Sequence, residues 1–125
     1  MYQSQLPPNQ YIMDVSELEK SKSHIIAEIL EYVPHAVVSA IIMKKVTGNI
    51  TVSSFDTGEK LAPKTSPFDS YIQIISGAAE LIINDKKYKL RLGEGIIIPA
   101  HAPHHFNANE RFKMISTIIK SGYEN

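Results

Sequence analysis

The sequence predicts an all-β fold with a short helical segment near its N-terminus. After residue 35, short runs rich in β-branched residues alternate with turn signals, at the spacing of roughly 8 to 12 residues that is typical of sandwiches and barrels. The clearest run is Ile96–Ile98, which follows a glycine turn and ends at Pro99. β-Branched side chains fit a buried, pleated surface, and proline cannot donate to a strand ladder. We therefore expect this run to be a short core strand.

Length and composition indicate one globular domain. The chain has 125 residues, of which 43% are hydrophobic and 21% charged, and a domain of this size buries roughly two thirds of its unfolded surface. The net charge is zero with the histidines neutral, so the composition shows no excess of positive charge that would favour binding to nucleic acid or anionic lipid. The chain contains no cysteine, and any metal site would need His or carboxylate ligands.

The N-terminal residues lack the pattern of a signal peptide, and no apolar run approaches the roughly 20 residues that span a bilayer. We therefore expect a cytoplasmic protein with neither a nucleic-acid nor a membrane partner. Residues 1–12 are polar and contain two prolines, which predicts a flexible tail before a single domain over residues 13–125. The spacing Asp14-x-x-Glu17 resembles a capping box, so one or two short helical turns are expected between about residues 16 and 31.

The remainder of the chain predicts strands and turns. Strands are expected over residues 37–46, 50–55, 71–75, 79–83, 88–92, 96–98 and 112–120. Residues 59–70 contain two prolines and predict a loop or an irregular edge segment. Three histidines follow the strand that ends at Pro99, so we expect chemistry at that rim of the domain.

Two glycine-framed motifs resemble those of the cupin superfamily. The first reads Gly58-x5-Lys64-x-Ser66-x3-Ser70-x6-Gly77, the second reads Gly93-x5-Pro99-x-His101-x2-His104, and fifteen residues separate them. The runs Lys64-Thr-Ser-Pro-Phe-Asp69 and Arg111-Phe-Lys-Met114 are also similar to those of small bacterial cupins. The resemblance covers about residues 37–120 and implies an RmlC-like double-stranded β-helix, the cupin jelly-roll barrel. It also implies a homodimer formed through the outer sheet.

The same resemblance implies that the metal site is degenerate. In metal-binding cupins, the first motif supplies two histidines and a glutamate, and the second supplies one histidine. The corresponding residues are Lys64, Ser66, Ser70 and His104, so His104 is the only retained ligand position. A lysine ammonium has no lone pair, and neutral hydroxyls are weak ligands. We therefore expect no cofactor and no bound metal.

A divalent metal at His104 remains the alternative, with His101 as a weak further ligand and Asp69 as a third. Strand alternation opposes this cluster, because if His104 points inward then His105 points outward, and His101 occupies a turn position where glycine is usual. Tyr71 would also point outward, towards a sheet-packing or dimer surface.

Seven residues are candidates for lining a ligand pocket: His104, Lys64, Ser66, Ser70, Asp69, Phe106 and Ile72. The leading hypothesis is a small-molecule-binding or regulatory module with no intact metal site. The alternative is an isomerase, lyase or dioxygenase acting on a sugar-like or small carbonyl substrate, with a residual site at His104. A third possibility is a dimerising scaffold whose interior is filled, because apolar residues line filled cores and pockets alike.

Overall fold

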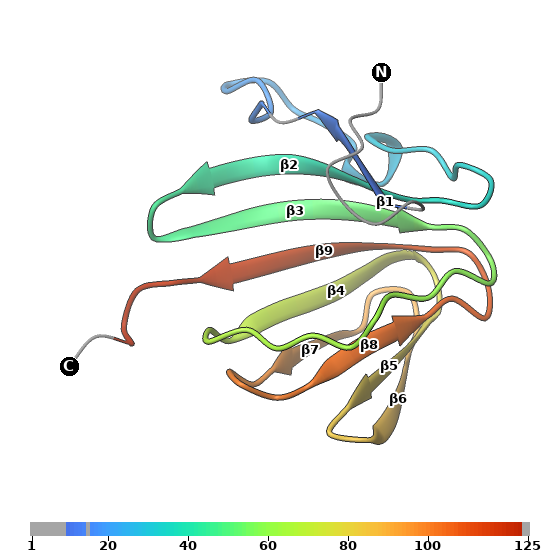
Figure 1. The fold of residues 1–125 in the computed structure, drawn as a ribbon. Coiled ribbons are helices and arrows are strands. Elements are labelled where there is room, and N and C mark those ends of the chain that lie inside the picture. Colours follow the sequence, from blue (N-terminus) through green and yellow to red (C-terminus); the bar gives the residue numbers. More distant parts are fainter. Residues whose placement is uncertain (1–9, 15, 124–125) are drawn as a thin grey trace.

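The computed structural model describes residues 10–14 and 16–123. Over these residues, the chain forms nine strands in two sheets and one short 3-10 helix (Figure 1). The elements are β1 (Gln10–Asp14), η1 (Ile26–Glu28), β2 (Val37–Lys45), β3 (Gly48–Phe55), β4 (Ser70–Gly77), β5 (Ala79–Ile83), β6 (Lys86–Leu90), β7 (Gly95–Ile98), β8 (His104–Asn107) and β9 (Phe112–Ile119). The larger sheet has the strand order β1-β2-β3-β9-β4-β7, and the smaller sheet has the order β6-β5-β8. The prediction of an all-β jelly-roll with hardly any helix is confirmed.

The seven predicted strands lie within two residues of observed ones, whereas β1 and β8 were not predicted. Strand β6 begins at Lys86, two residues before the predicted start. Asn84 and Asp85 both adopt positive φ, 49° and 65°, and such a two-residue turn returns the chain directly into its partner strand. Strand β8 was not predicted as an element, because a run of four residues that includes two histidines has little β propensity of its own.

The N-terminal predictions need correction. Residues 10–12 were assigned to a flexible tail, whereas they belong to β1, which pairs in parallel with β2; residues 1–9 of the predicted tail lie outside the described residues. The capping-box prediction was wrong, because Asp14 belongs to β1 and the Glu17 carboxylate accepts the Lys44 backbone N–H at 2.7 Å. The expected helical turns are reduced to η1, and no helix in residues 10–14 and 16–123 is long and apolar enough to cross a membrane.

The main core lies between the two sheets and centres on three phenylalanines. Phe55 stacks on Phe112 with ring centroids 4.4 Å apart, and each ring lies 5.9 Å from that of Phe106. Phe55 and Phe112 come from the larger sheet and Phe106 from the smaller one. Their contacts therefore hold the sheets together, because buried aromatic pairs contribute roughly 0.5 to 1.5 kcal/mol beyond the area that they bury.

A second apolar cluster covers the outer face of β2 and β3. Val38 and Val52 are fully buried there, together with Leu30 from the N-terminal segment, and Tyr11 and Ile26 pack against them. Adjacent residues of β2 point to opposite faces, so Val37 enters the main core while Val38 faces the N-terminal segment. Residues 16–36 therefore cover this half of the larger sheet (Figure 1).

One glycine of the first motif is required by both its conformation and its neighbours. Gly77 has a φ of +71° and pairs with Phe112 at the end of β4. A Cβ atom at this position would overlap the backbone carbonyl oxygen of Arg111. Both constraints favour glycine, which adopts positive φ without a steric cost and allows two backbones to approach closely.

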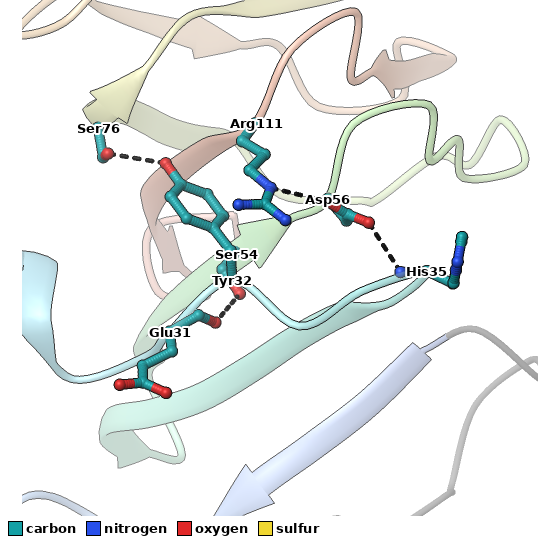
Figure 2. A network of polar contacts seen from close by, with 7 residues as sticks. All are labelled: Glu31, Tyr32, His35, Ser54, Asp56, Ser76 and Arg111. Carbon is teal, nitrogen blue, oxygen red and sulfur yellow. Dashed lines mark hydrogen bonds and ion pairs between the residues drawn. The ribbon is translucent and has the colours of Figure 1, made fainter.

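A polar network joins the N-terminal segment to the end of β3 (Figure 2). The Asp56 carboxylate accepts the His35 backbone N–H and the Arg111 Nε–H, each at 2.8 Å. The His35 N–H and then the Arg111 side chain stabilise the charged carboxylate, and together they lower the pKa of Asp56 from 3.8 to about 2. Asp56 therefore connects three segments that are distant in sequence.

Tyr32 extends this network towards β4. Its hydroxyl is hydrogen-bonded to the Ser76 hydroxyl at 2.7 Å (Figure 2). The Arg111 guanidinium carbon and the Lys113 Nζ lie 5.4 and 4.9 Å from the centroid of its ring, within the range of cation–π attraction. Lys113 also donates to the Ala27 carbonyl at 2.6 Å. The N-terminal segment is thus held by polar contacts as well as by the second apolar cluster.

We expect Asp56→Asn to lower the melting temperature near neutral pH, because the substitution removes a charge that two donors stabilise. The folded pKa lies below the unfolded one, so this contribution is fully present above about pH 4 and is lost as the pH falls towards about 2. Thermal melts followed by circular dichroism should therefore show the difference from wild type shrinking over that range. Asp85→Asn is the matched control, since asparagine also tolerates positive φ. An Asp56→Asn deficit that stays constant down to pH 2 would contradict the charge-based account.

Candidate functional site

A cavity of about 260 Å³ lies between the sheets, next to the phenylalanine core. Its polar lining is formed by Lys64, Thr65, Ser66, Ser70, His104 and Ser116. Its apolar lining is formed by Ile72, Ile98, Phe106, Met114 and Ile118. The interior beside His104 is therefore open, and the hypothesis of a completely filled interior is not supported.

The period of two along each strand selects these residues. Ser70 and Ile72 are buried on the inner face of β4, whereas Tyr71 between them is exposed on the outer face. Ser70 pairs with Ile118 of β9, and Ile72 pairs with Ser116. Directly opposed residues of antiparallel strands share one face of the sheet, so these side chains meet in the cavity.

The structure brings together six of the seven predicted pocket residues: His104, Lys64, Ser66, Ser70, Phe106 and Ile72. Asp69 is the exception and needs correction. Its Oδ1 accepts the Ala100 backbone N–H at 2.8 Å, and its own N–H donates to the Tyr123 hydroxyl at 2.7 Å. Since Asp69 immediately precedes an inward-facing serine, its side chain lies outside the cavity.

Five lining residues lie outside the seven that were predicted. Thr65 follows Lys64 in the loop, and Ile98 ends β7. Met114, Ser116 and Ile118 alternate along β9 on the same face as the buried Phe112. The signal was present in the sequence, because a two-residue step from Phe112 reaches each of them in turn.

His104 is the most deeply placed titratable group of the cavity. It is 6% exposed, and its Nδ1 lies 3.0 Å from the Ala102 carbonyl oxygen. A carbonyl can only accept, so Nδ1 carries the hydrogen. Burial lowers the pKa of His104 below 6.5, and the positive charge of Lys64 lowers it further, against the opposing effect of the hydrogen bond to Ala102. The imidazole is therefore neutral at pH 7, with an unprotonated Nε2 that has no hydrogen-bond partner among the described residues.

Lys64 lies opposite His104 at the mouth of the cavity. The two backbones exchange a pair of hydrogen bonds, each 3.0 Å long, in an isolated antiparallel bridge. Opposed residues of such a pair project to the same side, and both Lys64 and His104 line the cavity. Lys64 is exposed, and within the part of the chain that the structure describes it forms no ion pair with a carboxylate, Asp69 included.

The three histidines near the second motif do not converge. His101 occupies a turn with a φ of 67°, as the glycine-like position predicted, and its backbone N–H donates to the Ser66 carbonyl at 2.6 Å. His105 alternates with the buried His104 along β8 and pairs with Ile82. Among residues 10–14 and 16–123, no group of three or more His, Asp or Glu side chains could hold a metal ion.

The donor set of the cavity does not fit a transition metal. It offers one imidazole nitrogen, several neutral hydroxyls and an ammonium group that repels cations. Transition metals in protein sites prefer several imidazole, carboxylate or thiolate ligands. The described cavity lining instead suits an organic ligand with polar and apolar parts.

A second, open hollow of about 430 Å³ lies on the outer face of the larger sheet. Its lining consists of Tyr71, Ile97, Thr117, Ile119 and Tyr123, together with Asp69, Ser70, Ser121 and Gly122. Ile97 and Ile119 are 62% and 60% exposed. The hollow is larger than the inner cavity, but it offers an apolar surface instead of a convergent set of polar groups.

We expect His104→Gln to flatten the pH dependence of stability between about pH 7 and pH 5. The folded pKa of His104 is depressed, so the unfolded chain takes up a proton at this position when the folded chain does not, and wild-type stability falls as the pH falls through 6.5. Chemical denaturation at the two pH values measures the effect. His101→Asn is the control, since it alters a histidine in an exposed turn. Equal pH dependence in wild type and His104→Gln would show that the buried imidazole does not act in this way.

Comparisons with known proteins identify a matching family. The Cupin domain model matches residues 51–118. A search of curated proteins found no significant match.

Solved structures give the same fold. A conserved protein of unknown function from Streptococcus pyogenes has a TM-score of 0.79 and 28% identity, over 85% of this chain and 93% of that chain. A cupin superfamily protein from Desulfitobacterium hafniense has a TM-score of 0.77 and 24% identity, over 85% and 97%. A Cupin 2 conserved barrel domain protein from Leptotrichia buccalis has a TM-score of 0.73 and 32% identity, over 75% of this chain and 46% of that chain.

Proposed function

This chain belongs to the cupin family, and we propose that it acts as a small-molecule-binding module whose ligand occupies the cavity beside His104 without a metal ion held by protein side chains. The single observation that carries this proposal is the composition of the cavity. An apolar interior with a few convergent polar groups is typical of small-molecule sites.

The volume of the cavity supports a small ligand. About 260 Å³ lies just below the range of roughly 300 to 1,000 Å³ that ligand pockets usually occupy. A cavity of this volume suits a compact metabolite. The donor set supports the metal-independent part of the proposal, because His104 supplies one imidazole while Lys64 adds a positive charge beside it.

The state of His104 favours a specific second candidate, a metal-independent acid–base enzyme. Its neutral imidazole is oriented by the hydrogen bond to Ala102 and presents an unprotonated Nε2. Such a nitrogen can remove a proton from carbon next to a carbonyl group, as an isomerase or lyase of sugar-like or small carbonyl substrates requires. Lys64 would then stabilise the negative charge that develops on the carbonyl oxygen.

Two measurements test the binding function. We expect native protein purified without a histidine tag to contain substoichiometric metal by elemental analysis. In a thermal-shift screen of small metabolites, we expect at least one chemical class to raise the melting temperature of wild type and of His101→Asn, but not of His104→Ala. Stoichiometric transition metal that is lost in His104→Ala would contradict the metal-independent proposal, and a screen without any stabilising compound would contradict the binding proposal.

Proton exchange distinguishes the small-molecule-binding module from the acid–base enzyme. If His104 acts as a base, the protein should exchange the hydrogen next to a bound carbonyl for deuterium in D₂O, as followed by proton NMR, and His104→Ala should abolish the exchange. A ligand that binds without exchange favours the module.

We also propose that two copies of the chain associate through the outer hollow. Its exposed, mainly apolar surface carries a single carboxylate, Asp69, among the described lining residues, and a patch with so little charge is suited to the self-complementary contact of a twofold dimer. Wild type should elute as a dimer in light-scattering chromatography, and the double variant Ile97→Glu/Ile119→Glu should elute as a folded monomer. Leu92→Glu, a change at a 67% exposed residue outside the hollow, is the control and should remain dimeric. A monomeric wild type would contradict this proposal.

A further inference from the structure

The charges of the cavity lining have one sign. Lys64 contributes an ammonium group, and no Asp or Glu lies among the described lining residues. The nearest acidic residue in sequence, Asp69, directs its carboxylate to the Ala100 N–H outside the cavity. A positive group in a site without a compensating carboxylate favours an anionic ligand, because the ligand then supplies the missing charge.

Most polar groups of the lining lie towards one end of the cavity, although Ile98 and Ile118 flank Ser70 there and Ser116 pairs with Ile72 further in. His104 precedes Phe106 along β8, Ser70 precedes Ile72 along β4, and Lys64 pairs with His104. The opposite end is formed by Phe106 and by Met114 of β9, which belong to the buried core. The cavity therefore has a mouth that carries most of the polar groups and a mainly apolar floor.

The mouth contains hydrogen-bond donors as well as one well-defined acceptor. The Ser66 hydroxyl oxygen accepts the Phe68 N–H at 3.2 Å, which leaves its own hydrogen free to donate. Ser70 is 7% exposed and lines the cavity, so its hydroxyl adds a second donor. The acceptor is the His104 Nε2, because Nδ1 already donates to the Ala102 carbonyl. A carboxylate satisfies the donors, but it cannot satisfy this nitrogen, which requires an O–H or N–H group on the ligand.

The floor sets the size of the ligand's apolar part. A dry apolar cavity of about 150 Å³ is enough to hold benzene, and the cavity has about 260 Å³ in all. A ring or branched chain of that size on Phe106 and Met114 leaves room for a carboxylate and one further polar group at the mouth.

We propose that the cavity binds a small hydroxycarboxylic acid with an apolar body. Its carboxylate pairs with the Lys64 ammonium and the serine hydroxyls, its hydroxyl donates to the His104 Nε2, and its apolar body rests on Phe106 and Met114. The proposal rests on the function proposed above, and it makes Lys64 the group that selects for negative charge.

The experiment measures dissociation constants by calorimetry for a matched set of probes. These are the three ring isomers of hydroxybenzoate, the corresponding hydroxybenzamides, benzoate, and a free aldose. We expect one hydroxybenzoate isomer to bind roughly tenfold or more tightly than its amide, since a charge-assisted hydrogen bond contributes at least that factor. It should bind roughly two- to tenfold more tightly than benzoate, which lacks the hydroxyl that donates to the neutral His104 Nε2. Perturbed amide signals in two-dimensional NMR should lie at cavity residues such as Phe106 and not at outer-face residues such as Ile97.

Variants then assign the two polar contacts. Lys64→Met should weaken hydroxybenzoate binding roughly tenfold or more, leave amide binding unchanged and remove the weakening by added salt. His104→Leu should remove the preference for hydroxybenzoate over benzoate. Lys60→Met, which alters an exposed lysine of the same loop outside the cavity, should bind as wild type does. Circular dichroism of each variant establishes that the fold is retained.

Two outcomes would overturn the inference and are distinguishable from each other. If the amides or the aldose bind in the cavity as tightly as any hydroxybenzoate, or if Lys64→Met has no effect, the hydroxycarboxylate assignment fails while the binding function stands. If no probe binds and no metabolite stabilises the protein, the inference fails together with the proposed function.

Discussion

The alternation of side chains along each strand is the constraint on which the rest of this structure depends. In β4, Ser70, Ile72 and Ile74 are buried on the inner face, whereas Tyr71 between them is exposed on the outer face. A shift of one residue would exchange the cavity lining for the apolar outer surface. The same rule separates Asp69 from Ser70 and therefore leaves the cavity without a carboxylate.

The space between the sheets is divided into a filled half and an open half. Phe55, Phe106 and Phe112 fill one half with ring contacts. The cavity lies beside Phe106, and His104 lines it as well. The paired backbone hydrogen bonds between Lys64 and His104 fix the mouth of this open half. The rigid aromatic packing thus supports a site whose polar groups come from one loop and three strands.

The two faces of the larger sheet are used differently. The N-terminal segment covers the outer face over β2 and β3, where Leu30 is buried and where the Asp56 and Tyr32 contacts anchor the segment (Figure 2). The segment also contacts β4 and β9 through Ser76 and Lys113, but the hollow beside Tyr71 lies outside this cover, and Ile97 and Ile119 are exposed there. The N-terminal segment therefore completes the fold without approaching the cavity, and it leaves one apolar surface for a partner.

The sequence by itself determined the class of the fold, the positions of most strands, and six of the seven residues assigned to the pocket. These features follow from local information: β-branched runs, glycines where positive φ is required, and the two-residue period that placed His104 inward and Tyr71 outward. The same period also indicated Met114, Ser116 and Ile118, although they were missed.

Only the tertiary structure decided the direction of Asp69, the role of Glu17, the pairing of β1 with β2 and the existence of β8. Each of these depends on a partner far away in the chain, such as the Ala100 N–H for Asp69 and the Lys44 N–H for Glu17. Local propensity contains no information about such partners, because a hydrogen bond across the fold exists only after the strands have paired.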